Sequence, residues 1–152
     1  MTHERFQFDL SDIALVWSGL NLLENLWGVA GLTPAHLAMK RRFSPDQDLD
    51  VVQALFRGDE VSAVVEALAY SHAFASAQGN TVLDGNGADI TATTREHAHN
   101  LLTRMLQSVG SYDAVRVEAY LLELRTFAEE YARQVAAFAT ADQAPRVTGV
   151  QA

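Results

Sequence analysis

Two ionisable residues stand at positions where a helical pattern calls for apolar side chains. Glu24 continues the apolar series of one predicted helix at alternating spacings of four and three, and His72 does the same in another. A carboxylate that faces a protein core is costly unless it is paired or protonated. An imidazole is its natural partner, and such a pair can perform general acid–base chemistry near neutral pH. Glu24 and His72 are therefore the candidate catalytic residues. Alternatively, Glu24 reaches solvent at a helix edge and His72 is a hydrogen-bonded core histidine.

A stripe of uncharged polar residues lies beside Glu24 on the same predicted helix. Amide side chains on a central helix can line a polar pocket whose walls are aromatic rings. They can equally form hydrogen bonds with neighbouring helix ends or with buried water. The candidate ligand-binding residues are Trp17, Asn21, Asn25, Trp27 and Tyr70.

We expect no metal and no cofactor. His97 and His99 are two residues apart, so on a helix they point about 200° apart and cannot share an ion. The segment 84–89 resembles the start of a calcium loop, but Asp89 and Arg95 occupy the positions that require Gly and Glu. The sequence contains no cysteine, which excludes a thiolate nucleophile. It also contains no P-loop, dinucleotide-binding fingerprint or nucleophile elbow.

Composition and charge indicate an acidic, soluble, cytoplasmic protein. The 152 residues are 49% hydrophobic and 20% charged, which is typical of a single globular domain. The most apolar stretch, 13–32, contains Glu24 in its interior, so we expect no membrane span. The net charge of −8 opposes binding to nucleic acid. The segment 33–58 has some helix-turn-helix character, but three aspartates at 46–50 would face the phosphates.

The spacing of apolar and breaker residues predicts an all-α bundle of five to six helices in one domain, 1–152. An arm at 1–10 precedes a central helix over 12–31, and further helices are expected over 33–42, 44–56, 60–78, 93–109 and 112–141. Residues 79–92 are expected to form a small hairpin or ordered loop, and 142–152 a flexible tail.

The last predicted helix carries a heptad seam, which is typical of helix–helix packing. Its members alternate at spacings of three and four: Ala114, Val117, Leu121, Leu124, Ala128, Tyr131, Val135 and Phe138. This seam favours a non-catalytic interaction module, either a homodimer or the accessory subunit of a larger complex such as a biosynthetic one. The alternative is a small enzyme or small-molecule-binding protein with an apolar pocket around Glu24 and His72. The sequence does not decide whether the protein is an enzyme.

Overall fold

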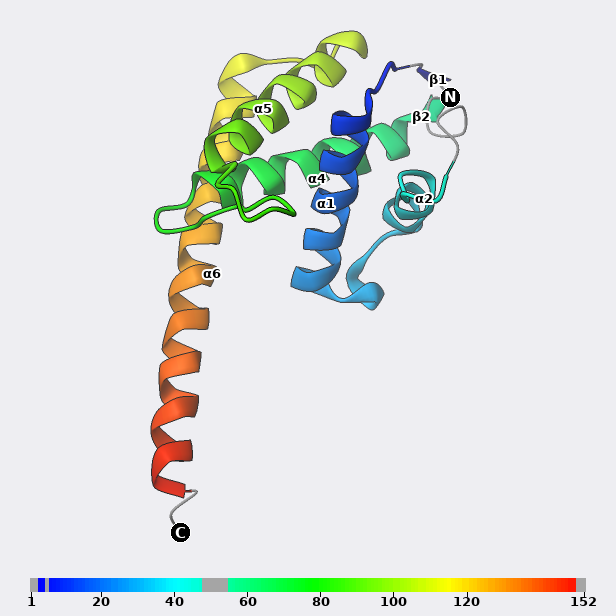
Figure 1. Ribbon diagram of the computed structural model, residues 1–152. Coiled ribbons are helices and arrows are strands. Elements are labelled where there is room, and N and C mark those ends of the chain that lie inside the picture. The colour runs from blue at the N-terminus through cyan, green and yellow to red at the C-terminus, as the bar shows by residue number, and fades with distance from the viewer. Residues whose placement is uncertain (1–2, 5, 48–54, 150–152) are drawn as a thin grey trace.

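The computed structural model describes the backbone of residues 3–4, 6–47 and 55–149, and the side chains of residues 6–47 and 55–138. Within these ranges the chain is an all-α bundle with a long C-terminal helix, as the sequence predicts (Figure 1). Its helices are α1 (Leu10–Trp27), α2 (Pro34–Arg42), α4 (Gly58–Ser76), α5 (Thr91–Ser108) and α6 (Ala114–Gly149). A 3₁₀ helix, η1 (Val29–Gly31), follows α1. The helix expected over 44–56 falls largely on residues 48–54, which lie outside the described ranges.

α4 occupies the centre of the bundle, where it packs against α1, α2, α5 and α6 (Figure 1). It buries nine residues, five of them alanines, and small side chains let neighbouring helices approach closely. The closest approach is at Gly19 of α1, where an added Cβ would lie 2.7 Å from the carbonyl oxygen of Ala67 and 2.8 Å from Oγ of Ser71. The expectation that the first helix is central was wrong, because α1 buries one face and leaves Ser18 and Asn25 exposed.

α1 begins at a pair of carboxylates, those of Asp9 and Asp12. Oδ1 of Asp9 accepts the backbone N–H of Asp12 (2.8 Å), and Oδ2 of Asp12 accepts the backbone N–H of Asp9 (3.1 Å). This reciprocal capping box satisfies two backbone donors, whereas the Ser11 hydroxyl donates to Asp9 instead (2.6 Å). Hydrogen bonds from the Ser11 hydroxyl and from the Asp12 N–H lower the pKa of Asp9. α2 begins after Thr33, whose side chain caps its first turn.

The N-terminal arm packs onto the body through aromatic rings. Phe6 and Phe8 are buried and contact Phe56, which is itself fully buried; Phe8 also contacts Phe43. The centroids of these contacts lie 5.3–5.7 Å apart in edge-to-face geometry, which aromatic pairs favour. Two short strands, β1 (His3–Glu4) and β2 (Phe56–Arg57), pair antiparallel beside this cluster.

The connection between α4 and α5 is an ordered loop. Leu83 and Asp89 form an isolated antiparallel bridge. Oδ1 of Asp84 accepts the backbone N–H groups of Asn86 (2.8 Å) and Ala88 (2.9 Å), and Gly87 supplies the positive φ that the turn requires. The Asp84 oxygen that could have bound calcium therefore holds the turn.

α6 is the longest helix and projects away from the body over much of its length (Figure 1). Asp113 begins it, because its side chain accepts the N–H of Arg116 (3.2 Å) and its carbonyl accepts the N–H of Val117 (2.9 Å). The helix continues to Gly149, past the predicted end at residue 141. Its 36 residues correspond to roughly 54 Å at about 1.5 Å per residue.

Candidate functional site

Glu24 and His72 have different partners in the structure. The carboxylate of Glu24 forms an ion pair with Nζ of Lys40 on α2. The ring of His72 packs beside that of His99 on α5, with centroids 5.5 Å apart, and its Nδ1 is buried without a hydrogen-bond partner. Burial, and then the neighbouring His99, lower the pKa of His72. No hydrogen bond or ion pair joins the two predicted catalytic residues in the part of the chain that the structure describes.

Of the five predicted ligand-binding residues, Trp17 alone lines either of the two hollows described in this section. The rings of Trp27 and Tyr70 meet edge to face, with centroids 5.3 Å apart. Trp17 lines a separate small cavity of about 280 Å³ beside the end of α2. Asn21 is half-buried and Asn25 is exposed, and neither lines this cavity or the larger groove described below.

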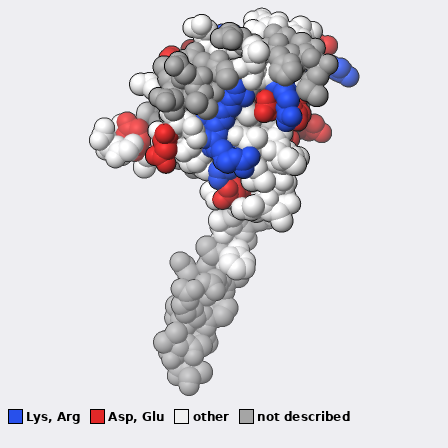
Figure 2. Space-filling model, turned by 90° about the vertical axis from the view of Figure 1, so that its right-hand side faces the viewer, with Lys and Arg blue, Asp and Glu red and all other residues white. Residues whose placement is uncertain are grey.

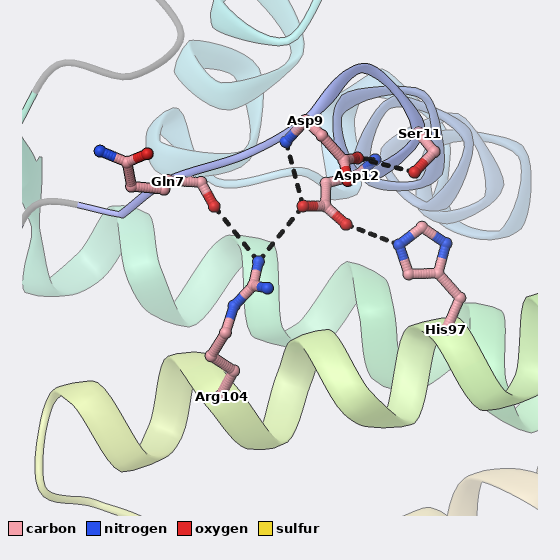
Figure 3. Close-up of polar contacts among 6 residues, drawn as sticks. All are labelled: Gln7, Asp9, Ser11, Asp12, His97 and Arg104. Carbon is pink, nitrogen blue, oxygen red and sulfur yellow. Dashed lines mark hydrogen bonds and ion pairs between the residues drawn. The ribbon is translucent and has the colours of Figure 1, made fainter.

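Asp12 joins α1 to α5 through a polar cluster (Figure 3). The carboxylate is buried; its Oδ1 lies 2.6 Å from Nε2 of His97, and its Oδ2 accepts a hydrogen bond from Arg104 (3.2 Å). Arg104 also donates to the carbonyl of Gln7 (3.2 Å), and the backbone N–H of Asp9 donates to Oδ2. These hydrogen bonds connect the N-terminal arm and α1 to α5. Because both oxygens of the Asp12 carboxylate already have partners, neither is free to bind a ligand.

The two histidines of α5 contact different helices. Whereas His97 bonds to Asp12 of α1, Nε2 of His99 lies 2.8 Å from Oε1 of Glu118 on α6. Among the described side chains, no group of three or more His, Asp or Glu residues is arranged to hold a metal ion.

A histidine–carboxylate pair that sequence reasoning missed lies between α2 and α4. The backbone N–H of Thr33 donates to Nδ1 of His36 (3.1 Å), and the Thr33 hydroxyl lies 2.7 Å from the same nitrogen. Because Nδ1 accepts, the ring proton of a neutral imidazole is on Nε2, which donates to Oε1 of Glu66 (2.6 Å). Trp27 packs against this imidazole with centroids 5.9 Å apart. The only sequence signal was the capping pattern of Thr33 and His36, which does not point to a residue thirty positions away.

His36 and Glu66 line a groove of about 790 Å³ between α2, α4, α5 and the first turns of α6. Much of its lining is apolar and includes Val61, Leu106 and Val109. One wall is Tyr120, whose phenol pKa is raised by burial and then by the charge of Glu66, so the phenol stays neutral at physiological pH. The groove is thus an apolar surface with an oriented carboxylate at its edge.

The heptad seam of α6 divides into two parts. The proximal seam is buried against the body: Val117, Leu121, Leu124 and Ala128. The distal seam becomes steadily more exposed, with Tyr131 at 37%, Val135 at 49% and Phe138 at 74%. An apolar pattern that packs the core at one end is therefore open to solvent at the other.

Basic side chains gather in a band on the face that carries α2, with acidic side chains beside it (Figure 2). Lys40 pairs with Glu24, and Arg42 lies 3.5 Å from a carboxylate oxygen of Glu60. The guanidinium of Arg42 also covers the ring of Phe56 at 3.9 Å from its centroid. These two cations therefore have structural partners within the chain.

Comparison with known proteins gave no relative: no family model, no curated protein and no solved structure matches this chain. Among the described helices, none combines the length and the hydrophobicity that crossing a membrane requires.

Proposed function

We propose that this chain is a non-catalytic interaction module that associates with a second copy of itself through the distal seam of α6. One observation carries the proposal: a single heptad pattern passes from 0% exposed at Ala128 to 74% exposed at Phe138. In a heptad seam, the apolar positions stay aligned so that they can face a partner helix along the whole length. α4 is that partner for the proximal seam, and the distal seam needs another.

The physics of isolated helices supports an intermolecular partner. A helix of few turns is marginal in water, and most helical stability in proteins comes from packing of an apolar face. In the distal seam, Tyr131 still contacts Phe74 of α4, whereas Val135 and Phe138 lie farther along the helix and are 49% and 74% exposed. A second helix packed along it would remove these side chains from water.

The charges on this part of α6 favour a second copy as the partner. Arg125 lies 3.4 Å from Glu129, and Arg133 lies 2.6 Å from Glu130, so the charges are compensated within one helix. Two identical copies therefore meet without a large electrostatic penalty, and they can form the self-complementary contact of a two-fold dimer. A heterologous partner would have no complementary charge of one sign to recognise here.

The size of the distal seam sets the expected affinity. Three exposed apolar residues on one helix make a small interface, well below the roughly 1,200–2,000 Å² of a stable complex. We therefore expect a reversible dimer with a dissociation constant in the micromolar range, which corresponds to about −8 kcal/mol.

The proposal is tested by placing a charge on the seam and, as a control, beside it. Val135→Arg should abolish association, because it puts a cation at the centre of the interface. Leu122→Arg is the matched control, since Leu122 is an exposed apolar residue (62%) of the same helix outside the seam. Size-exclusion chromatography of the full chain with light-scattering detection should show a dimer for the wild type and for Leu122→Arg. It should show a monomer for Val135→Arg. A wild-type monomer at all concentrations contradicts self-association and leaves a heterologous partner.

A further inference from the structure

A carboxylate with no lysine or arginine partner among the described side chains lies at the edge of the groove between α2, α4 and α6. Glu66 is one-third exposed, and Oε1 is fixed by the Nε2–H of His36 at 2.6 Å. The backbone N–H of Thr33 donates to Nδ1 of the same imidazole, so the ring is held from both sides and fixes the direction of the carboxylate. Among the described residues, no Lys or Arg forms an ion pair with Glu66, whereas Glu24, Glu60 and Asp12 all have such partners.

The remaining lining of the groove determines which ligands fit that charge. Asp59 is the second acidic side chain in it, and neither lysine nor arginine lines the groove. An anionic ligand would therefore be repelled. Tyr120 also lines the groove, and an aromatic ring attracts a cation at its face, the more strongly when the partners are partly desolvated.

The apolar part of the groove provides room for more than a simple ion. Val61, Leu106 and Val109 supply hydrophobic surface next to the carboxylate, and about 790 Å³ is the volume range of small-molecule sites. Small-molecule sites typically combine such apolar walls with a few placed polar groups. Here the placed groups are Glu66, oriented by His36, and the ring of Tyr120.

We propose that this groove is a binding site for a small organic cation, an amine or quaternary ammonium compound with an aromatic or aliphatic body. The ammonium lies against the free side of the Glu66 carboxylate and beside Tyr120, and the apolar body lies over Val61, Leu106 and Val109. This site is separate from the distal seam of α6, so its function does not depend on self-association.

The first experiment compares probes that share a phenyl body and differ in charge. The probes are benzyltrimethylammonium and phenethylamine as cations, 2-phenylethanol as the neutral analogue and phenylacetate as the anion. Nitrogen-15 NMR titrations of the full-length chain report binding through the backbone amides of Ser62, Glu66 and Tyr120. We expect both cations to bind at least about tenfold more tightly than 2-phenylethanol, and phenylacetate not to bind.

The second experiment uses variants that remove or occupy the charge. Glu66→Gln keeps an acceptor for the Nε2–H of His36 but removes the negative charge, so cation affinity should fall by about tenfold or more. Ser62→Lys leaves Glu66 intact and places a tethered ammonium one helical turn away, on the exposed surface of α4. It should likewise exclude the cationic probes. Glu96→Gln is the matched control, because Glu96 is an exposed carboxylate of α5 that does not line the groove.

The outcomes separate cleanly. Cation-selective binding that is lost in Glu66→Gln and Ser62→Lys and kept in Glu96→Gln supports the site. If Glu66→Gln does not fold, as judged by circular dichroism, Ser62→Lys carries the same comparison, because its substitution is on the surface. Equal binding of phenethylamine and 2-phenylethanol, cation binding that survives in a folded Glu66→Gln or Ser62→Lys variant, or no amide shifts with either cation at millimolar concentration, would overturn the proposal.

Discussion

The ring of Tyr131 on α6 meets the ring of Phe74 near the end of α4, with centroids 5.9 Å apart and planes inclined by 67°. One turn earlier in the seam, Ala128 is fully buried; one turn later, Val135 is half exposed. The contact therefore marks the point where α6 leaves its own domain. Before it, the heptad pattern packs the core. After it, by our proposal, the same pattern packs a second copy.

The proximal seam should contribute to the stability of the single chain. Leu124 is buried at 8% exposure, and Leu124→Ala is expected to lower the free energy of unfolding by about 2–4 kcal/mol. Leu122→Ala removes the same atoms from an exposed position two residues away. It should change the free energy of unfolding by less than about 0.5 kcal/mol. Urea denaturation measures both, and equal effects of the two substitutions would show that α6 does not pack on this face.

The crossing of α1 and α4 should not tolerate an added methyl group. In Gly19→Ala the new Cβ would lie 2.7 Å from the backbone oxygen of Ala67, so a helix must shift, at a cost of about 1–3 kcal/mol. Gly58→Ala is the control, because a Cβ at Gly58 meets no atom within 4 Å. Thermal and urea unfolding should separate the two variants. A Gly19→Ala variant as stable as Gly58→Ala would rule out the close crossing.

The polar cluster at Asp12 should stabilise the junction of the arm, α1 and α5. Asp12→Ala removes the partner of the Asp9 backbone N–H and of the His97 ring, and leaves Arg104 only the carbonyl of Gln7, which should cost about 2 kcal/mol. Glu96→Ala, at an exposed carboxylate of α5, should have little effect. The difference between the two variants in urea midpoint measures the cluster, and no difference would mean that it contributes nothing.

His72 should make the fold sensitive to mild acid. Burial, followed by the neighbouring His99, lowers the pKa of His72 below its ordinary value near 6.5. The unfolded chain then binds a proton that the folded chain resists, so stability is full above about pH 6.5 and decreases as pH falls toward the lowered pKa. His72→Gln should reduce this pH dependence between about pH 7.5 and 5.5. Urea denaturation at these two pH values measures the difference in unfolding free energy. If that difference is the same in His72→Gln as in the wild type, His72 is not the source of the acid sensitivity.

The helices were predictable because their periodic apolar faces and their breakers are local features. The heptad seam of the last predicted helix, which α6 carries, illustrates this. The central place of α4 was not predictable in the same way, since it depends on small residues such as Ala67 meeting Gly19 of another helix. A hydrophobicity pattern favours the more apolar helix, α1, as the centre of the bundle. Close packing favours α4, because its small side chains let other helices approach.

The candidate site was less predictable than the fold, because its residues meet only in three dimensions. Glu24 forms an ion pair with Lys40 of the neighbouring helix, where the sequence pattern predicted an imidazole. His36 sits in a capping position that local sequence explains fully, so nothing in the sequence directs attention to its contact with Glu66. The distal seam was predicted as an apolar stripe, and only the structure separates it from the part that packs on α4.

Sedimentation equilibrium of the unmodified full chain tests the central claim, self-association through α6, most directly. Over a range from about 1 µM to several hundred µM, the weight-average mass should rise from the monomer value of 16.6 kDa toward twice that value, fitted by one monomer–dimer constant in the micromolar range. A mass that stays at the monomer value across the whole range would contradict the account.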